Sequence, residues 1–385
     1  MIEEYIRAAR RTKPPTEELI AEYQKHYECI KANVSSTGGY PALFVTYSSE
    51  RRCELVRLGD KLHLVYDQYL GQSFNRLNRI QFAKNRPDLL SMAYACKFIA
   101  ERLVTLNSIG LGAFFGLMSR QLEKNAYEKG DPFESLCENK LRYKMIAAQE
   151  MYVMAHELAH HRWSLDHVAI SSEMSTYIEE FLQSGDEALS STESSQPLSD
   201  HYRAILDSAG PEFREEIFAD DFGGMIAMRA ALTLGVRPWQ TSLGVILAVR
   251  YLRLFRHLEI ISHRMDKLIR LGQCVDFHSS LKSLNNDIWD PETGAIGRFQ
   301  FREHFLRYRL RTDRKKLPDY DVSNEAKITA VIGDYDEKTE FPAVLELVDR
   351  LANSLTSSLL MEIERSIHSK GNISHIVDQL TGWQK

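Results

Sequence analysis

The chain has 385 residues, of which 44% are hydrophobic and 26% are charged, and its formal net charge is -5 at pH 7. This composition is typical of a globular protein and excludes a disordered or fibrous chain. The acidic balance gives no indication of nucleic-acid binding at the level of the whole chain. The cysteines are widely spaced and form no Cys-x-x-Cys pair, which favours reduced thiols in the cytoplasm and excludes cysteine-based zinc sites.

The first predicted elements are a helix over residues 16–32 and strands within residues 38–49 and 51–71. In the second strand segment, Gly59-Asp60 is typical of a hairpin turn because side chains alternate beyond it. Residues 73–125 then have a helical pattern, which Arg86-Pro87 interrupts once.

The most apolar stretch covers residues 103–119. It is shorter than a membrane-spanning helix and contains polar residues and glycines. We therefore expect a buried helix or helix pair there, a soluble protein and no membrane span.

Further helices are predicted from residue 131 to Trp163, over 211–234 and over 241–271. Residues 184–200 are rich in serine and acids without periodicity, which predicts a surface loop. Residues 273–340 are mixed, and a last helix begins near Pro342. The whole pattern predicts a mainly helical α+β fold in three parts: residues 1–130 with a small sheet and helices, 131–272 with central helices, and 273–385 with a mixed and helical region.

The segment MAHELAHHRW contains the motif His-Glu-x-x-His at His156, Glu157 and His160. Helical residues four apart share one face, so both imidazoles can reach one metal ion. Glu157 lies beside His156, where its carboxylate can take a proton from a water near that ion. Because the flanking residues are apolar, these polar groups need a shared partner, and zinc supplies one. The alternative is two histidines that form hydrogen bonds within the core.

A third ligand is expected in one of two places. The frame of the metzincins puts Asp166 at the ligand position, followed by His167. However, Trp163 occupies the position of the glycine that lets that chain turn sharply back to the metal.

The other place is the helix predicted over residues 211–234. Glu216 and Asp220 share one face of it, so Glu216 can reach the metal while Asp220 accepts the second N–H of a ligating histidine. Gly223 and Gly224 would let this helix approach the histidine helix closely. An acidic, solvated start of a helix is the alternative.

HELAH and EIFAD together resemble the motifs of the gluzincin metallopeptidases. They are most similar to those of the CAAX-prenyl-protease and HtpX-like families and of the cytosolic ImmA/IrrE-like regulators, and the chain also resembles phage-exclusion peptidases. The resemblance implies a zincin-like metallopeptidase core within residues 131–272. It implies zinc as the cofactor, with His156, His160 and Glu216 as ligands, Glu157 as the base and Asp220 as the hydrogen-bond partner of a ligand.

We therefore expect a zinc-dependent endopeptidase that hydrolyses peptide bonds in an intracellular protein. An edge strand of the small sheet would bind the extended peptide. We expect a protein or peptide partner and no nucleic acid. The alternative is a non-catalytic regulatory or interaction protein, in which zinc is structural or the motif is vestigial. A structural zinc is closed by four protein ligands, whereas a catalytic zinc keeps one position open.

The resemblance also implies a further donor for the oxyanion of the reaction. The CAAX-prenyl-protease and HtpX-like enzymes share a Ser-His-Pro stretch with a later arginine. Here ISHRMDKLIRL contains Ser262, His263 and Arg270, with Arg264 in place of the proline. This implies His263 as the donor, and His304 is the alternative.

The most basic segment, residues 301–316, interleaves arginines and lysines with aromatic residues. Such a pattern can bind nucleic acid. Because the chain as a whole is acidic, we expect a solvated face or a contact with an acidic partner instead.

Overall fold

The computed structural model describes residues 15–34, 39–48, 50–83, 86–128, 130, 132, 136–189, 198–270, 295–317, 320–338, 347, 351, 357–368 and 376–377. The chain forms two compact units, each assembled from three segments. The first consists of Met1–Asn75, Asn139–Arg250 and Asp290–Ile328, and the second of Arg76–Glu138, Tyr251–Trp289 and Thr329–Lys385. Neither unit coincides with one of the three parts predicted from the sequence.

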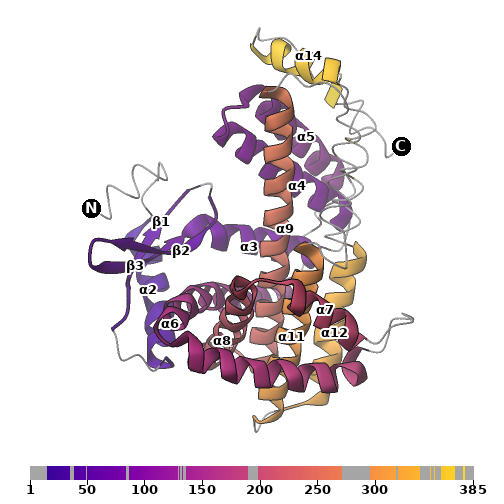
Figure 1. Ribbon diagram of the computed structural model, residues 1–385. Helices are drawn as coiled ribbons and strands as arrows, with labels where there is room; N and C mark the ends of the chain where they lie inside the picture. The colour runs from indigo at the N-terminus through magenta and orange to yellow at the C-terminus, as the bar shows by residue number, and fades with distance from the viewer. Residues whose placement is uncertain are drawn as a thin grey trace. The chain divides into compact units, whose positions relative to one another are not determined.

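The first unit contains a three-stranded sheet in the order β1-β3-β2 (Figure 1). The central strand β3 (Lys61–Asp67) is parallel to β1 (Ala42–Thr46) and antiparallel to β2 (Cys53–Leu58). The predicted hairpin is confirmed, and Gly59 at its turn has a φ of 61°, which favours glycine. Among the described strands β2 pairs with β3 alone, so its other edge has no strand partner in the described part of the chain.

The other secondary structure in the described residues of the first unit is helical, which confirms the expected mainly helical α+β class. The helix α2 (Glu17–Ala32) packs against β1 and α8 (Pro211–Thr233), and α8 packs against α11 (Ala295–Lys315). The unit also contains most of α6 (Leu136–Leu189), all of α7 (Leu198–Ser208) and the first part of α9 (Pro238–Arg270). The region predicted to be mixed is helical in α11 and in α12 (Val322–Lys338).

The helix α6 is longer than the sequence predicted. Its expected end was Trp163, but it continues to Leu189 across one non-helical residue, Asp166, with φ -149° and ψ 49°. The loop predicted over residues 184–200 is therefore wrong at both ends, which are helical. Its middle, residues 190–197, lies outside the described residues.

The second unit contains α4 (Pro87–Thr105) and α5 (Ile109–Tyr127), which pack against each other. The apolar stretch at residues 103–119 is thus part of a buried helix pair, interrupted near Asn107, whose φ is 65°. Arg102 on α4 forms an ion pair with Glu259 on α9. The helix α3 (Gln68–Gln81) contains the boundary between the units, because the first segment of the first unit ends at Asn75 and the second unit begins at Arg76.

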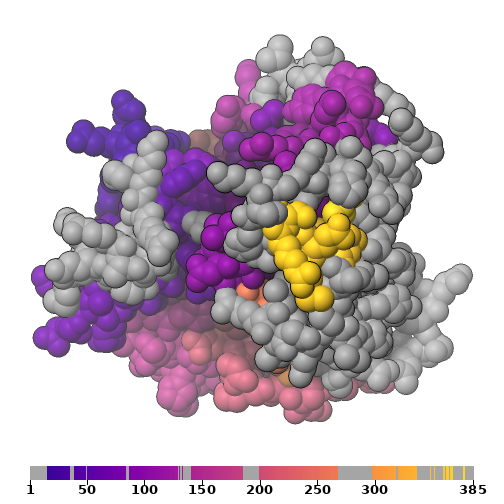
Figure 2. Space-filling view, turned by 90° about the horizontal axis from the view of Figure 1, so that it is seen from above, coloured from indigo at the N-terminus to yellow at the C-terminus, as the bar shows by residue number. Residues whose placement is uncertain are grey.

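The C-terminal helix α14 (Ser357–His368) packs on α5. Ile363 on this helix is buried, whereas Met361 is exposed, and the outer side of the helix is visible on the surface (Figure 2). Much of the last helix predicted from the sequence, including its start at Pro342, lies outside the described residues.

None of the helices in the described ranges is long and apolar enough to cross a membrane.

A close approach between α6 and α8 positions the histidine motif. A Cβ atom added to Gly223 would lie 3.0 Å from the backbone nitrogen of His156 and 3.1 Å from its Cα. Gly224, the next residue, faces the other way, and its added Cβ would lie 2.9 Å from Leu306 on α11. The two glycines therefore hold α8 tightly between α6 and α11, which are drawn beside it in Figure 1.

We expect Gly223→Ala to destabilise the first unit by about 1–3 kcal/mol, because the new methyl group meets backbone that cannot rotate away. Gly116→Ala is the matched control: Gly116 is also in a helix, and nothing lies within 4 Å of its added Cβ. That control should be neutral or stabilising by up to about 1 kcal/mol. Thermal unfolding of both variants tests this, and a stabilising Gly223→Ala would contradict the close approach.

Candidate metal centre

His156 and His160 lie one turn apart on α6, and their Nε2 atoms are 3.3 Å apart. The ring planes are nearly perpendicular, with an interplanar angle of 78°. Two nitrogens bound to one tetrahedral zinc at about 2.0–2.1 Å lie roughly 3.3–3.4 Å from each other. The flanking residues Met151, Met154, Ala155, Leu158 and Ala159 are buried. The two imidazoles therefore converge as ligands of one ion would.

Glu216 on α8 brings a carboxylate to the same point. Its Oε2 lies 3.8 Å from His156 Nε2, and its Oε1 lies 3.6 Å from His160 Nε2. The structure thus brings Glu216 close to the histidine pair, and its role as the third ligand stays a prediction.

The alternative ligands after the motif, Asp166 and His167, lie away from the histidine pair's buried helix face. The helix α6 stays helical past Trp163, whose ring lies 5.6 Å from that of Phe218 on α8. The chain does not turn back there, and the kink comes only at Asp166. Asp166 and His167 are both exposed. The structure therefore favours Glu216 over Asp166 as the third donor.

Asp220 has three close polar neighbours inside the first unit. Its Oδ1 lies 3.1 Å from His156 Nδ1 and 2.6 Å from the hydroxyl of Tyr152. The third contact is the guanidinium of Arg302 on α11. Burial alone would raise the pKa of Asp220, but Arg302 and His156 outweigh it and hold the pKa well below its usual range. Asp220 therefore stays charged and lies on the Nδ1 side of His156, while Nε2 is on the side of His160 and Glu216. Its predicted role as the hydrogen-bond partner of a ligand stays a prediction.

Glu215, Tyr152 and Arg302 complete the site and were not predicted. Glu215 Oε1 lies 2.8 Å from His160 Nδ1, so each histidine has a carboxylate behind it. The signal for Glu215 was its place next to Glu216 in the sequence. For Arg302 the signal was the surplus of acids around the motif, because buried carboxylates need a cation.

The expectation of a solvated basic face on α11 is wrong for three of its arginines. Arg302, Arg309 and Arg314 are largely buried, and each pairs with a carboxylate of the first unit. They hold α11 against α8 and α12. The helical period of α11 turns these arginines toward the interior, as it does Phe301 and Phe305.

Glu157 lies beside the histidines and is partly buried. Its carboxylate, with donor atoms of His156 and His160, belongs to a group whose atoms all lie within 4.8 Å of one another. The backbone N–H of Leu55 on β2 donates a hydrogen bond to it. Burial, with the nearby carboxylate of Glu216, raises the pKa of Glu157 to about 7 although His156 opposes the shift. Such a carboxyl group can accept and release a proton near neutral pH.

The two histidines considered as oxyanion donors lie on other helices. His263 is in the second unit, on α9, where a ring nitrogen lies 3.5 Å from Arg102 Nη2. His304 is on α11 in the first unit, and its Nδ1 contacts the hydroxyl of the buried Tyr202. The predicted role of His263 as oxyanion donor stays a prediction.

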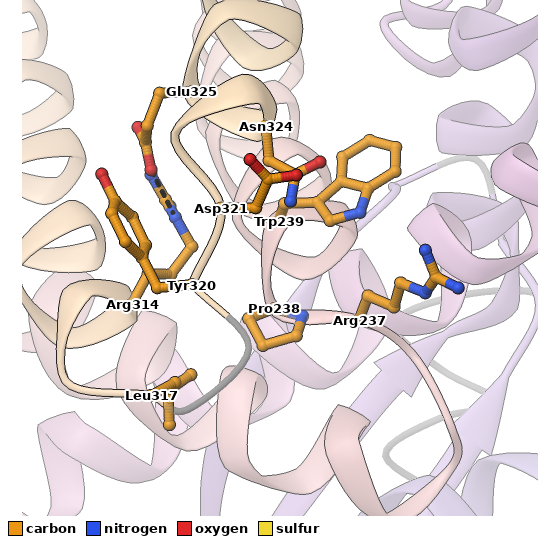
Figure 3. Close-up of a pocket in the computed structure, with 9 residues that line it drawn as sticks. All are labelled: Arg237, Pro238, Trp239, Arg314, Leu317, Tyr320, Asp321, Asn324 and Glu325. Atoms are coloured by element: carbon orange, nitrogen blue, oxygen red, sulfur yellow. Dashed lines mark hydrogen bonds and ion pairs between the residues drawn. The ribbon is translucent and has the colours of Figure 1, made fainter.

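A separate cavity of about 320 Å³ lies in the first unit between the turn before α9 and the turn before α12. Figure 3 shows Trp239 and Pro238 on one side of it and Tyr320 on the other, with Arg314 paired to Glu325. The residues that line it include none of the candidate metal ligands. This cavity is therefore not part of the metal centre.

The donor set fits a zinc ion. Both Nδ1 atoms face carboxylates, so both Nε2 atoms could bind a metal ion, and Glu216 could supply an oxygen ligand. Two imidazoles and one carboxylate leave one position of a tetrahedron for water or substrate.

Comparison of the chain with family models, with curated proteins and with solved structures finds no match in any of the three. Any functional assignment therefore depends on the geometry of this site and on the motifs themselves.

We expect the purified protein to bind about one zinc ion per chain. His156→Ala, His160→Ala and Glu216→Ala should each lower zinc occupancy strongly, because each removes a converging donor. Asp166→Ala and His167→Ala are the controls and should bind zinc like the wild type. Elemental analysis of the metal content checks all five variants. Full occupancy in Glu216→Ala together with loss in Asp166→Ala would move the third ligand to Asp166.

Proposed function

We propose that the protein is a zinc-dependent endopeptidase of the gluzincin type that cleaves an intracellular protein. The observation that supports this most strongly is the convergence of His156 Nε2, His160 Nε2 and the Glu216 carboxylate, with the Glu157 carboxylate close to both histidines. The same arrangement supports a zincin-like core built from α6 and α8. The proposed likeness to gluzincins rests on the two sequence motifs and on the geometry of the proposed donors.

The reaction requires a Lewis acid, a base and a place for the peptide. A zinc ion held by His156, His160 and Glu216 would polarise the scissile carbonyl and lower the pKa of a water molecule. Glu157 accepts a proton from the attacking water molecule while the oxygen of that water bonds to the carbonyl carbon. When the C–N bond breaks, Glu157 delivers that proton to the leaving amine. Asp220 and Glu215 keep the imidazoles oriented throughout.

The outer edge of β2 would give the substrate a place to bind. In an antiparallel pair, alternate residues direct their N–H and C=O groups away from the partner strand. Leu55 directs its N–H to Glu157, so the outer edge of β2 faces the proposed base. By the same alternation, Arg57 also directs its backbone groups outward. An extended peptide that pairs with this edge would lie along the catalytic glutamate.

We expect Glu157→Gln to keep the fold and the bound zinc but to lose activity by about 10²–10⁴-fold, because it removes a base and no ligand. The measurement is a search for new protein N-termini in a cell lysate treated with wild type or with the variant. Termini that persist with Glu157→Gln would end the proposed mechanism.

The same variant separates the non-catalytic alternative from the proposal. If Glu157 closed the site as a fourth ligand, Glu157→Gln would weaken zinc binding, and no new N-termini would arise from the wild type.

Arg57→Pro tests the place of the substrate. Proline removes one outward N–H, which an edge strand tolerates, and leaves the ladder to β3 intact. For a peptide that spans an identified cleavage site, we expect kcat/KM to fall by about 2–10-fold, the value of one hydrogen bond. Arg57→Ala is the control, because it removes the side chain alone. An equal loss in both variants would assign the effect to the side chain and contradict pairing along β2.

A further inference from the structure

One arginine from α11 contacts two of the three carboxylates that α8 contributes to the centre, Glu216 and Asp220. Arg302 Nε lies 2.6 Å from Asp220 Oδ2, and its Nη2 lies 2.9 Å from Asp220 Oδ1. The same Nη2 lies 2.9 Å from Glu216 Oε2. The guanidinium is thus bidentate toward Asp220 and shared with the proposed third ligand. Its side chain is 15% exposed, so water competes little for these contacts.

Glu216 needs such a partner more than the histidines do. Its side chain is 38% exposed, while that of Asp220 is 1% exposed. A partly exposed glutamate loses several rotamers when it is held in one orientation, and that loss opposes metal binding. A contact that already orients the carboxylate removes this cost before the metal arrives.

Arg302 also acts on one histidine through Asp220. The Oδ1 atom of Asp220 that receives Arg302 Nη2 also lies 3.1 Å from His156 Nδ1. Fixing Asp220 therefore fixes the ring of His156. A single guanidinium reaches two of the three proposed donors, one directly and one through a carboxylate.

We propose that Arg302 is a positioning residue of the metal centre, which holds Glu216 and, through Asp220, His156 in the geometry that binds zinc. The inference rests on the proposed zinc site. It predicts that the shape of the guanidinium matters as well as its charge, because a lysine ammonium is a point charge that cannot form the same fork across two carboxylates.

Arg309 provides a matched control on the same helix. Its Nε lies 2.9 Å from Asp221 Oδ1, so it also joins α11 to α8. The two side chains are 9% and 7% exposed, which is similar burial to the Arg302–Asp220 pair. Its other described contact is the ring of Tyr177, at 3.7 Å, and it touches none of the proposed ligands. A change at Arg309 therefore disturbs the packing of α11 without reaching the centre directly.

The experiment compares Arg302→Lys with Arg309→Lys, and Arg302→Gln with Arg309→Gln. Zinc affinity is measured by competition with a chromophoric chelator, and stability by urea unfolding of the metal-free protein. We expect both Arg302 variants to bind zinc about 10–100-fold more weakly than the wild type. Both Arg309 variants should lose stability but keep the wild-type affinity. The lysine pair decides the question if a glutamine variant does not fold.

A second readout is the visible absorption of Co²⁺ bound in place of zinc, which depends on the number and arrangement of its ligands. The spectrum should change in Arg302→Lys and stay unchanged in Arg309→Lys. A purely structural role for Arg302 would leave it unchanged in both.

Three results would overturn the inference. The first is wild-type zinc affinity in Arg302→Lys, and the second is an equal loss in the Arg302 and Arg309 variants. The third is tighter binding by Arg302→Gln, which would mean that Arg302 acts as a repelling charge. A wild-type protein that binds no zinc would instead refute the proposed function, so the two failures are distinguishable.

Discussion

The backbone of α8 touches the backbone of α6 at Gly223, and the arrangement of the metal centre depends on that contact. Glu216, Asp220 and Gly223 are spaced by four and then three residues, so they share one face of α8. The face that meets His156 therefore also carries both carboxylates. Any side chain at position 223 would separate the helices, and a separation of about 1 Å is enough to impair a site of this kind.

The same contact creates an electrostatic problem that the fold must solve. It collects the carboxylates of Glu157, Glu215, Glu216 and Asp220 around two imidazoles in a partly buried space. Carboxylates so close together are stable only near cations. Arg302 supplies one positive charge from α11, and the remaining negative charge favours a bound cation. Stability of the first unit and affinity for a metal are therefore linked.

The sequence was most informative where spacing along one helix decides the geometry. His156 and His160 could be placed on one face from the helical period alone, and so could Glu216 and Asp220. It was less informative where contacts join distant segments. Arg302 was predicted on a solvated basic face, because the helical period alone does not show which side of α11 is covered. The length of α6 beyond Trp163 was also missed, because the kink at Asp166 interrupts the pattern without ending the helix.

The sequence by itself determined the small sheet with its hairpin, most of the helices of the first unit, the histidine pair and two alternative places for the third ligand. These follow from local rules: residue period, turn residues and the spacing of donor atoms on a helix. Tertiary structure alone decided that Glu216 and not Asp166 meets the histidines, that β2 presents its open edge to Glu157, and that Arg302 joins two acids of the centre. Those outcomes depend on how helices and strands far apart in the chain pack, and burial and charge pairing settle that only once the whole unit has folded.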